Sequence, residues 1–522
     1  MRSVVRFARF ASPALALAAM GCGGGGMGAA SGMPAREMQP SYPTQAQLAA
    51  PTSPVAADAP ALEAAKTEDY ADYGVNPVVD AQKDRFSTFA IDVDTASYSV
   101  ARRKLIEGSL PPAASVRVEE FLNYFDYGYA APERGPFAVH LAAAPSPYAA
   151  GHHLVRVGVQ GKRVAPSERK PVHLVYLVDT SGSMATPDKI GLAKKSLELL
   201  TGSLQAGDTV AICTYAGSVR EVLPPTGVDN RSRIYAAIGD LGASGSTAMS
   251  SGIELAYSLA ERTLVKGHVN RVIVLSDGDA NVGPASHQEI LARIRGYKEK
   301  GITLSTVGFG NGNYKDTMME QLANQGDGNY SYIDSFEQAR RVFSNQVGGL
   351  LEVIARDVKI QVEFDPAVVQ SYRLVGYENR NVADKDFRND KVDAGEIGAG
   401  HSVTALYDVV LKSTAQSPIT VRLRHKAPLG SEKAEETVVT MPASAMSASF
   451  AAAPADLRFA AAVMGAAEIL RHSPHAQGWK LADVERIARA ASKDVADHRE
   501  LIDLVHRAAA LSGEIPAVAV AQ

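Results

Sequence analysis

The sequence contains little cysteine, because Cys22 and Cys213 are the only two in 522 residues. Cys213 lies inside the apolar run TVAICTYA, and we interpret it as a small buried hydrophobic residue. Cys22 stands near the amino terminus, far from any apolar strand pattern. This usage fits an exported protein that has no disulfides.

Strong charge and long apolar runs are also missing. The formal net charge of −4 and pI near 6.3 leave no electrostatic footprint for nucleic acid, and short basic clusters such as Arg102–Lys104 read as solvated helix faces. After the first 22 residues no stretch is long and apolar enough to span a bilayer. The chain contains no H-E-x-x-H, G-x-S-x-G or G-x-x-x-x-G-K-[ST] motif, so we do not expect an enzyme.

The amino terminus has the pattern of an export signal. Arg2, Arg6 and Arg9 precede an apolar Ala/Leu segment that ends in AAMGC. This segment resembles a bacterial lipoprotein signal, which implies lipidation of Cys22, removal of the preceding residues and a lipid-anchored protein of the cell envelope. The alternatives are an ordinary cleaved signal or an uncleaved anchor. Residues 23–84 are rich in Gly, Ala, Pro, Ser and Gln, and are expected to form a disordered tether.

One stretch, VHLVYLVDTSGSM (Val172–Met184), combines a buried strand with ligand-type side chains. Its apolar part is typical of a strand buried on both faces of a parallel sheet, and it runs directly into Asp179, Ser181 and Ser183. Open α/β sheets bind ligands at the carboxyl ends of their strands. A set of oxygen atoms alone suits a hard cation such as Mg²⁺.

Two later stretches complete a pattern. Thr247 stands in a Gly/Ser loop before a helix, and Asp277 follows the apolar strand NRVIVLS. D-x-S-x-S, then Thr, then Asp, in this order, resembles the metal-ion-dependent adhesion site of von Willebrand factor type A (VWA) domains. The resemblance implies that Ser181 and Ser183 bind Mg²⁺ or Mn²⁺ directly, and Thr247 directly or through water. Asp179 and Asp277 would hold bound waters and the serine hydroxyls.

The pattern of elements predicts an α/β protein. Strands and helices alternate over residues 171–352, which predicts a Rossmann-like, doubly wound parallel sheet that ends in a helix over 337–353. The resemblance implies that this unit is the VWA domain. Alternating strand patterns flank it at 136–170 and 353–445, so we expect the domain to be inserted in a β-sandwich. Small helical regions are expected at 85–135 and 455–512, with Asp94 or Thr95 capping the first helix and Asp92 ending a strand.

The resemblance extends beyond the metal loops. FSTFAIDVDTASYSVARRKL and LPPAASVRVEEFLNYFDY resemble the amino-terminal region of bacterial YfbK-type VWA proteins, and the β-then-helical tail resembles their carboxyl-terminal region. The expected function is metal-dependent protein binding, in which an Asp or Glu of a partner protein completes the ion's coordination. The alternatives are a structural envelope lipoprotein with an incidental metal, and a metal-dependent hydrolase in which the ion activates water.

Overall fold

The computed structural model describes residues 68–245, 249–278, 287–310, 314–414, 417–428 and 433–516. Within these ranges the strands form three sheets. No helix among them is both long enough and apolar enough to cross a bilayer. Cys22, Thr247 and residues 1–67 of the signal and tether lie outside the described residues.

The six-stranded sheet lies within the predicted VWA domain, and its strand order is β10-β9-β8-β5-β6-β7. All neighbouring strands pair in parallel except the edge strand β7, which is antiparallel to β6 and contains Pro224 and Pro225. An edge position suits proline, which cannot donate to a ladder. The strands are β5 (Val172–Asp179), β6 (Thr209–Tyr215), β7 (Val219–Gly227), β8 (Val269–Ser276), β9 (Ile302–Phe309) and β10 (Tyr330–Ile333).

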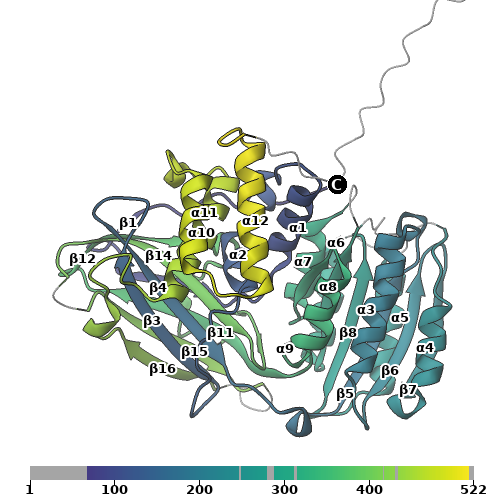
Figure 1. The fold of residues 1–522 in the computed structure, drawn as a ribbon. Coiled ribbons are helices and arrows are strands. Elements are labelled where there is room, and N and C mark those ends of the chain that lie inside the picture. Colours follow the sequence, from purple (N-terminus) through teal and green to yellow (C-terminus); the bar gives the residue numbers. More distant parts are fainter. Residues whose placement is uncertain are drawn as a thin grey trace, which may run out of the picture. The chain divides into compact units, whose positions relative to one another are not determined.

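Helices cover both faces of this sheet (Figure 1). Leu174, Tyr176 and Val178 of β5 pack with α3, α4 and α8, whereas Val175 and Leu177 pack with α5 and α6. Because β5 is buried on both faces, its apolar run shows no alternation, as expected for a central parallel strand. The helices are α3 (Leu192–Gly202), α4 (Arg231–Gly239), α5 (Met249–Arg262), α6 (His287–Glu299), α7 (Asp316–Gln325), α8 (Phe336–Arg340) and α9 (Val347–Leu351).

The helix predicted over 337–353 is present, but it is divided into three helical segments and ends at Leu351. The segments are α8, a π-helical turn (Arg341–Asn345) and α9. Gly348 and Gly349 lie in α9, and a Cβ at Gly349 would stand 1.9 Å from Nε2 of His401, so this part of the chain packs directly on a neighbouring turn. The interruption itself falls at Gln346, between the π-helical turn and α9.

The flanking strands form the predicted sandwich around the inserted VWA domain. One sheet has the order β1-β12-β14-β4-β3, and in the other β11 pairs with β2, β13 and β15, while β16 forms an edge. Their inner faces share one core, which includes Phe89, Val157, Ile360 and Val403. The strands are β1 (Val79–Asp80), β2 (Phe86–Ala90), β3 (Phe137–Pro145), β4 (His152–Gly161), β11 (Val353–Phe364), β12 (Val369–Val375), β13 (Ile397–Gly398), β14 (Ser402–Leu411), β15 (Ile419–Lys426) and β16 (Glu435–Thr440).

The two predicted helical regions share one core. Phe121 and Phe125 near α2 pack with Phe459 and other residues of the carboxyl-terminal helices, and with the outer face of the sheet that contains β14. The helices are α1 (Ala96–Ile106), α2 (Val118–Tyr124), α10 (Ala455–Leu470), α11 (Leu481–Ala491) and α12 (Ala496–Leu511). This layer also reaches the VWA domain, since Ala96 and Val100 of α1 pack on Tyr330 and Tyr332 of β10 and so cover that edge strand.

The folded body begins before the predicted boundary at residue 85. β1 pairs with β12, and the backbone N–H of Asp69 donates to the carbonyl of Tyr314 over 3.0 Å. Glu68 forms ion pairs with Arg103 and Lys104 of α1. Residues 68–84 therefore pair through backbone atoms and isolated charges, which the Gly/Ala/Pro-rich composition of the preceding segment does not reveal. The interpretation of Arg102–Lys104 as a solvated helix face is wrong for Arg102 and Arg103, which are buried and ion-paired.

Candidate metal centre at the carboxyl edge of the parallel sheet

Asp179 stands at the carboxyl end of β5, with both carboxylate oxygens hydrogen-bonded. Its Oδ1 accepts from the backbone N–H of Ser181 over 2.9 Å, and its Oδ2 accepts from the hydroxyl of Ser276, at the end of β8, over 2.8 Å. The first bond fixes the turn after β5, and the second joins the ends of two neighbouring strands. The Asp179 side chain is therefore fully buried and held in one orientation.

Burial raises the pKa of the Asp179 carboxyl above its ordinary value. Hydrogen bonds from Ser181 and Ser276 oppose that shift, and the neighbouring Asp277 adds to it. The edge thus brings two carboxylates close together in a buried position, where a negative charge is costly without compensation. A cation, either a positively charged side chain or a bound ion, can supply that compensation.

Ser181 and Ser183 follow in the same turn, and their Oγ atoms lie 3.0 Å apart. Ser181 is buried, whereas Ser183 is partly exposed, so the pair faces from the interior toward the surface. In an octahedral magnesium site with bonds of 2.0–2.1 Å, two adjacent ligand oxygens lie about 2.9 Å apart. The separation of the two hydroxyls therefore fits adjacent positions around Mg²⁺.

A second loop is fastened to this turn by its backbone. The N–H of Ser244 donates to the carbonyl of Thr180 over 2.7 Å, and the N–H of Gly182 donates to the carbonyl of Gly245 over 2.9 Å. Thr247 lies outside the described residues, but Gly245, two residues before it, is thus held against the serine turn. Its predicted role as a ligand stays a prediction.

Asp277 follows β8 and is fully buried. Its Oδ2 lies 3.0 Å from the ammonium nitrogen of Lys189, a residue that sequence reasoning missed. Gly278, the next residue, has a φ of +74°, and a Cβ there would stand 2.8 Å from the backbone nitrogen of Lys315, so glycine is required. Lys189 carries no local signal in the sequence, because it looks like any lysine at the start of an amphipathic helix.

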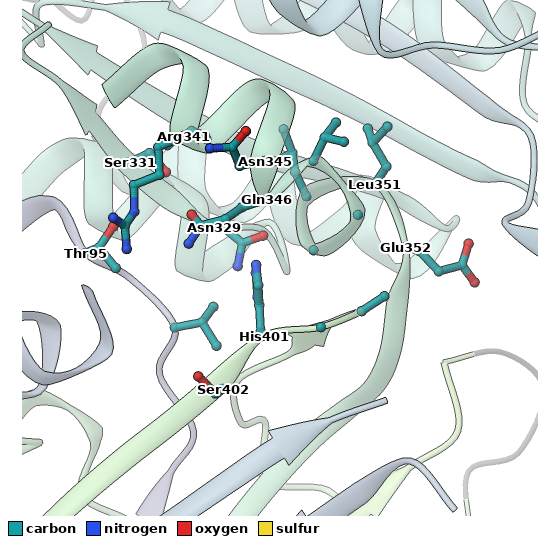
Figure 2. Close-up of a pocket in the computed structure, with 18 of the residues that line it drawn as sticks. Thr95, Asn329, Ser331, Arg341, Asn345, Gln346, Leu351, Glu352, His401 and Ser402 are labelled. Carbon is teal, nitrogen blue, oxygen red and sulfur yellow. The ribbon is translucent and has the colours of Figure 1, made fainter. Parts of the chain in front are cut away.

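A separate cavity of about 600 Å³ lies away from this edge. Its lining includes Asn329, Arg341, Gln346 and His401, and Figure 2 shows the His401 ring directed toward Asn329 and Gln346. Burial lowers the pKa of His401 to about 4, so the imidazole is neutral near pH 7. None of the residues from Asp179 to Met184 lines this cavity, which leaves it distinct from the candidate metal centre.

Thr95 is the N-cap residue of α1, as predicted, but its side chain makes no capping hydrogen bond. Asp94 instead accepts from the backbone N–H of Tyr330 over 2.8 Å and pairs with Arg380, which also pairs with Asp92. These contacts bind the amino-terminal region both to the VWA domain and to the segment after β12. Because 286 residues separate Asp94 from Arg380, no local sequence pattern could have revealed the pair.

Known protein families match successive parts of this chain. The von Willebrand factor type A domain family matches residues 173–345, and a family described as von Willebrand factor matches residues 64–156. The family described as "Uncharacterized protein YfbK, C-terminal" matches residues 349–420 and 412–511. "Uncharacterized protein YfbK" of Escherichia coli (strain K12) is 37% identical over 472 residues, which cover 85% of this chain and 81% of that protein.

The chain belongs to the YfbK family of VWA-domain proteins. This YfbK-family chain is also 24% identical to human inter-alpha-trypsin inhibitor heavy chain H3 over 267 residues, which cover 46% of the chain and 29% of that protein. Among solved structures, von Willebrand factor type A from Catenulispora acidiphila has 16% identity and a TM-score of 0.43, with coverage of 73% of this chain and 91% of that one. The pilus adhesin SpaC from Lactobacillus rhamnosus GG has 15% identity and a TM-score of 0.30, with coverage of 60% and 48%.

Proposed function

We propose that this YfbK-family protein is a metal-dependent protein-binding module of the cell envelope. A divalent ion, Mg²⁺ or Mn²⁺, binds at the carboxyl edge of the VWA sheet and docks an Asp or Glu side chain of a partner protein. Ser181, Ser183 and Thr247 supply neutral oxygen ligands. Asp179 and Asp277 hold bound waters and orient the hydroxyls. Lipidation at Cys22 anchors the protein to a membrane.

The observation that carries this proposal is the arrangement of the serine turn. Two hydroxyl oxygens lie 3.0 Å apart, next to Asp179. Each carboxylate oxygen of Asp179 accepts one hydrogen bond, from Ser181 N–H or from the Ser276 hydroxyl, and keeps a second lone pair for a bound water. A first shell made largely of neutral hydroxyls leaves a divalent ion poorly compensated. A carboxylate brought by another protein would supply the missing charge, and it would approach from the side of Ser183, which is partly exposed. This chemistry favours docking over turnover.

The function is tested by capture of partners from the native membrane with the full chain as bait. Wild type, Ser183→Ala and Ser218→Ala are compared in Mg²⁺ and in EDTA, with bound proteins identified after crosslinking. Ser218 is exposed and follows β6, so its variant controls for loss of a surface hydroxyl near the same edge. We expect a partner that is captured by wild type and Ser218→Ala in Mg²⁺, and lost both in EDTA and with Ser183→Ala.

Two outcomes contradict the proposal. Capture that is indifferent to chelation and to Ser183→Ala supports a structural role in which the metal is incidental. Release of a chemically changed partner in Mg²⁺ but not in EDTA supports the hydrolase alternative. The membrane anchor is tested separately, since Cys22→Ser is expected to move the protein from the membrane to the soluble fraction.

A further inference from the structure

Lys189 is buried at the candidate metal centre. Its side chain is 8% exposed, and the Asp277 carboxylate that it contacts is not exposed at all. Lysine is rarely buried without a partner of opposite charge. Lys189 lies in a π-helical turn (Pro187–Gly191) that precedes α3, and such turns are often found at functional sites. The turn places the lysine stem inside the sheet edge instead of on the solvent face of the helix.

The end of β9 leaves room for that stem. Gly310 has a φ of +76°, and a Cβ at this position would stand 2.2 Å from Cε of Lys189 and 2.5 Å from its Cγ. Any other residue at 310 would collide with the lysine over most of its length. Because residue 310 has no side chain, the Lys189 stem can pass the end of β9 and bring its ammonium to Asp277.

In this position the Lys189 ammonium lies beside Asp277, at the site where a divalent ion is proposed to bind. Without an ion, the ammonium compensates the buried Asp277 carboxylate, which would otherwise be costly to keep in the interior. With an ion bound, the ammonium and the metal repel each other across the same carboxylate. The Lys189 ammonium thus stabilises the ion-free site and destabilises the ion-bound site.

We propose that Lys189 is a built-in cation that preserves the ion-free site and lowers its affinity for the divalent ion. The inference rests on the metal site of the proposed function and adds its regulation. The lysine makes the metal exchangeable, so that docking responds to the concentration of divalent ions around the protein. It acts through Asp277 and is a positioning residue, with no ligand role of its own.

Titration calorimetry with MgCl₂ on the full chain tests the proposal, using wild type, Lys189→Met and Lys195→Met. Lys195 is exposed one turn into α3, so its variant removes the same charge at a distance from Asp277. We expect Lys189→Met to bind Mg²⁺ at least tenfold more tightly than wild type, and Lys195→Met to match wild type. In EDTA, Lys189→Met should melt at a lower temperature than wild type, and added Mg²⁺ should reduce that difference.

The outcomes separate this inference from the proposed function. If wild type binds Mg²⁺ and Lys189→Met binds it equally or more weakly, the lysine proposal is overturned and the metal site stands. If neither protein binds Mg²⁺, both proposals fail. Lys189→Gln, which keeps an N–H donor for Asp277, replaces the Met variant if that variant does not fold, and the same gain in affinity is expected.

Discussion

Arg117 joins the amino-terminal region to the VWA domain through a buried ion pair. Its side chain is 5% exposed, and its Nη1 lies 2.7 Å from Oδ2 of Asp316, at the start of α7. It also pairs with Glu120, and Glu320 lies at 3.9 Å. Arg117→Met keeps much of the side-chain volume but leaves three buried carboxylates without this guanidinium.

Breaking a buried pair by removal of one partner costs about 3–5 kcal/mol, because the remaining charge stays buried. We expect Arg117→Met to lower the free energy of opening α7 by about this amount. Since each 1.4 kcal/mol is a factor of ten, amide exchange in α7 should accelerate roughly 100-fold or more. Native-state hydrogen exchange with mass spectrometry measures this locally and does not require the whole chain to unfold in a single step.

Arg486→Met is the matched control, because Arg486 pairs with Asp483 on the surface, where the side chains are 73% and 55% exposed. Exposed pairs contribute at most about 1 kcal/mol, so exchange should change less than tenfold. The double variant Arg117→Met/Asp316→Asn removes one of the uncompensated carboxylates and should recover part of the lost protection. Equal exchange in Arg117→Met and wild type would refute this account of the junction.

Three further predictions concern the site and its surroundings. Gly278→Ala should lower the free energy of unfolding by about 1–3 kcal/mol, because alanine is strained at a φ of +74° and its Cβ would collide with Lys315. Gly296→Ala in α6, where no atom lies near the added Cβ, should leave stability unchanged or raise it. Thermal melts of both variants measure the difference. Burial and the neighbouring Glu378 raise the pKa of Glu119 to about 8, so its proton is lost near pH 4.5 in the unfolded chain but only near pH 8 in the fold. Stability should therefore fall as pH rises from about 4.5 to 8, and Glu119→Gln should flatten that slope, with an unchanged slope as the contrary result. Mg²⁺ at 100 times its Kd should raise the unfolding free energy by about 2.7 kcal/mol, which EDTA should reverse and which a protein without a metal site would not show.

The parts of the fold that the sequence predicts are those with local signals. The apolar run before Asp179 predicts a central strand, and strand patterns on both sides of residues 171–352 predict an insertion into a sandwich, as the pairing of β2 with β11 and β4 with β14 confirms. The sequence identifies Asp179, Ser181 and Ser183 as one group because they are close together in the chain. Asp277 is found because it ends a second apolar strand.

The remaining features depend on contacts across long sequence separations. The joining of α1 and α2 with α10–α12 into one core arises from residues more than 300 positions apart, such as Phe125 and Phe459. Each of these helices alone is simply amphipathic or apolar, and its partner is not encoded locally. The same holds for Lys189, whose contact with Asp277 depends on the π-helical turn and on the space at Gly310.

The measurement that bears most directly on metal-dependent docking is a Mg²⁺ titration of three purified full-length proteins. Wild type, Ser181→Ala/Ser183→Ala and Ser218→Ala are followed by calorimetry, and melting is recorded in EDTA to establish that all three are folded. We expect one bound ion for wild type and Ser218→Ala, and a loss of binding for the double serine variant. Equal Mg²⁺ affinity in all three proteins would contradict metal binding by Ser181 and Ser183.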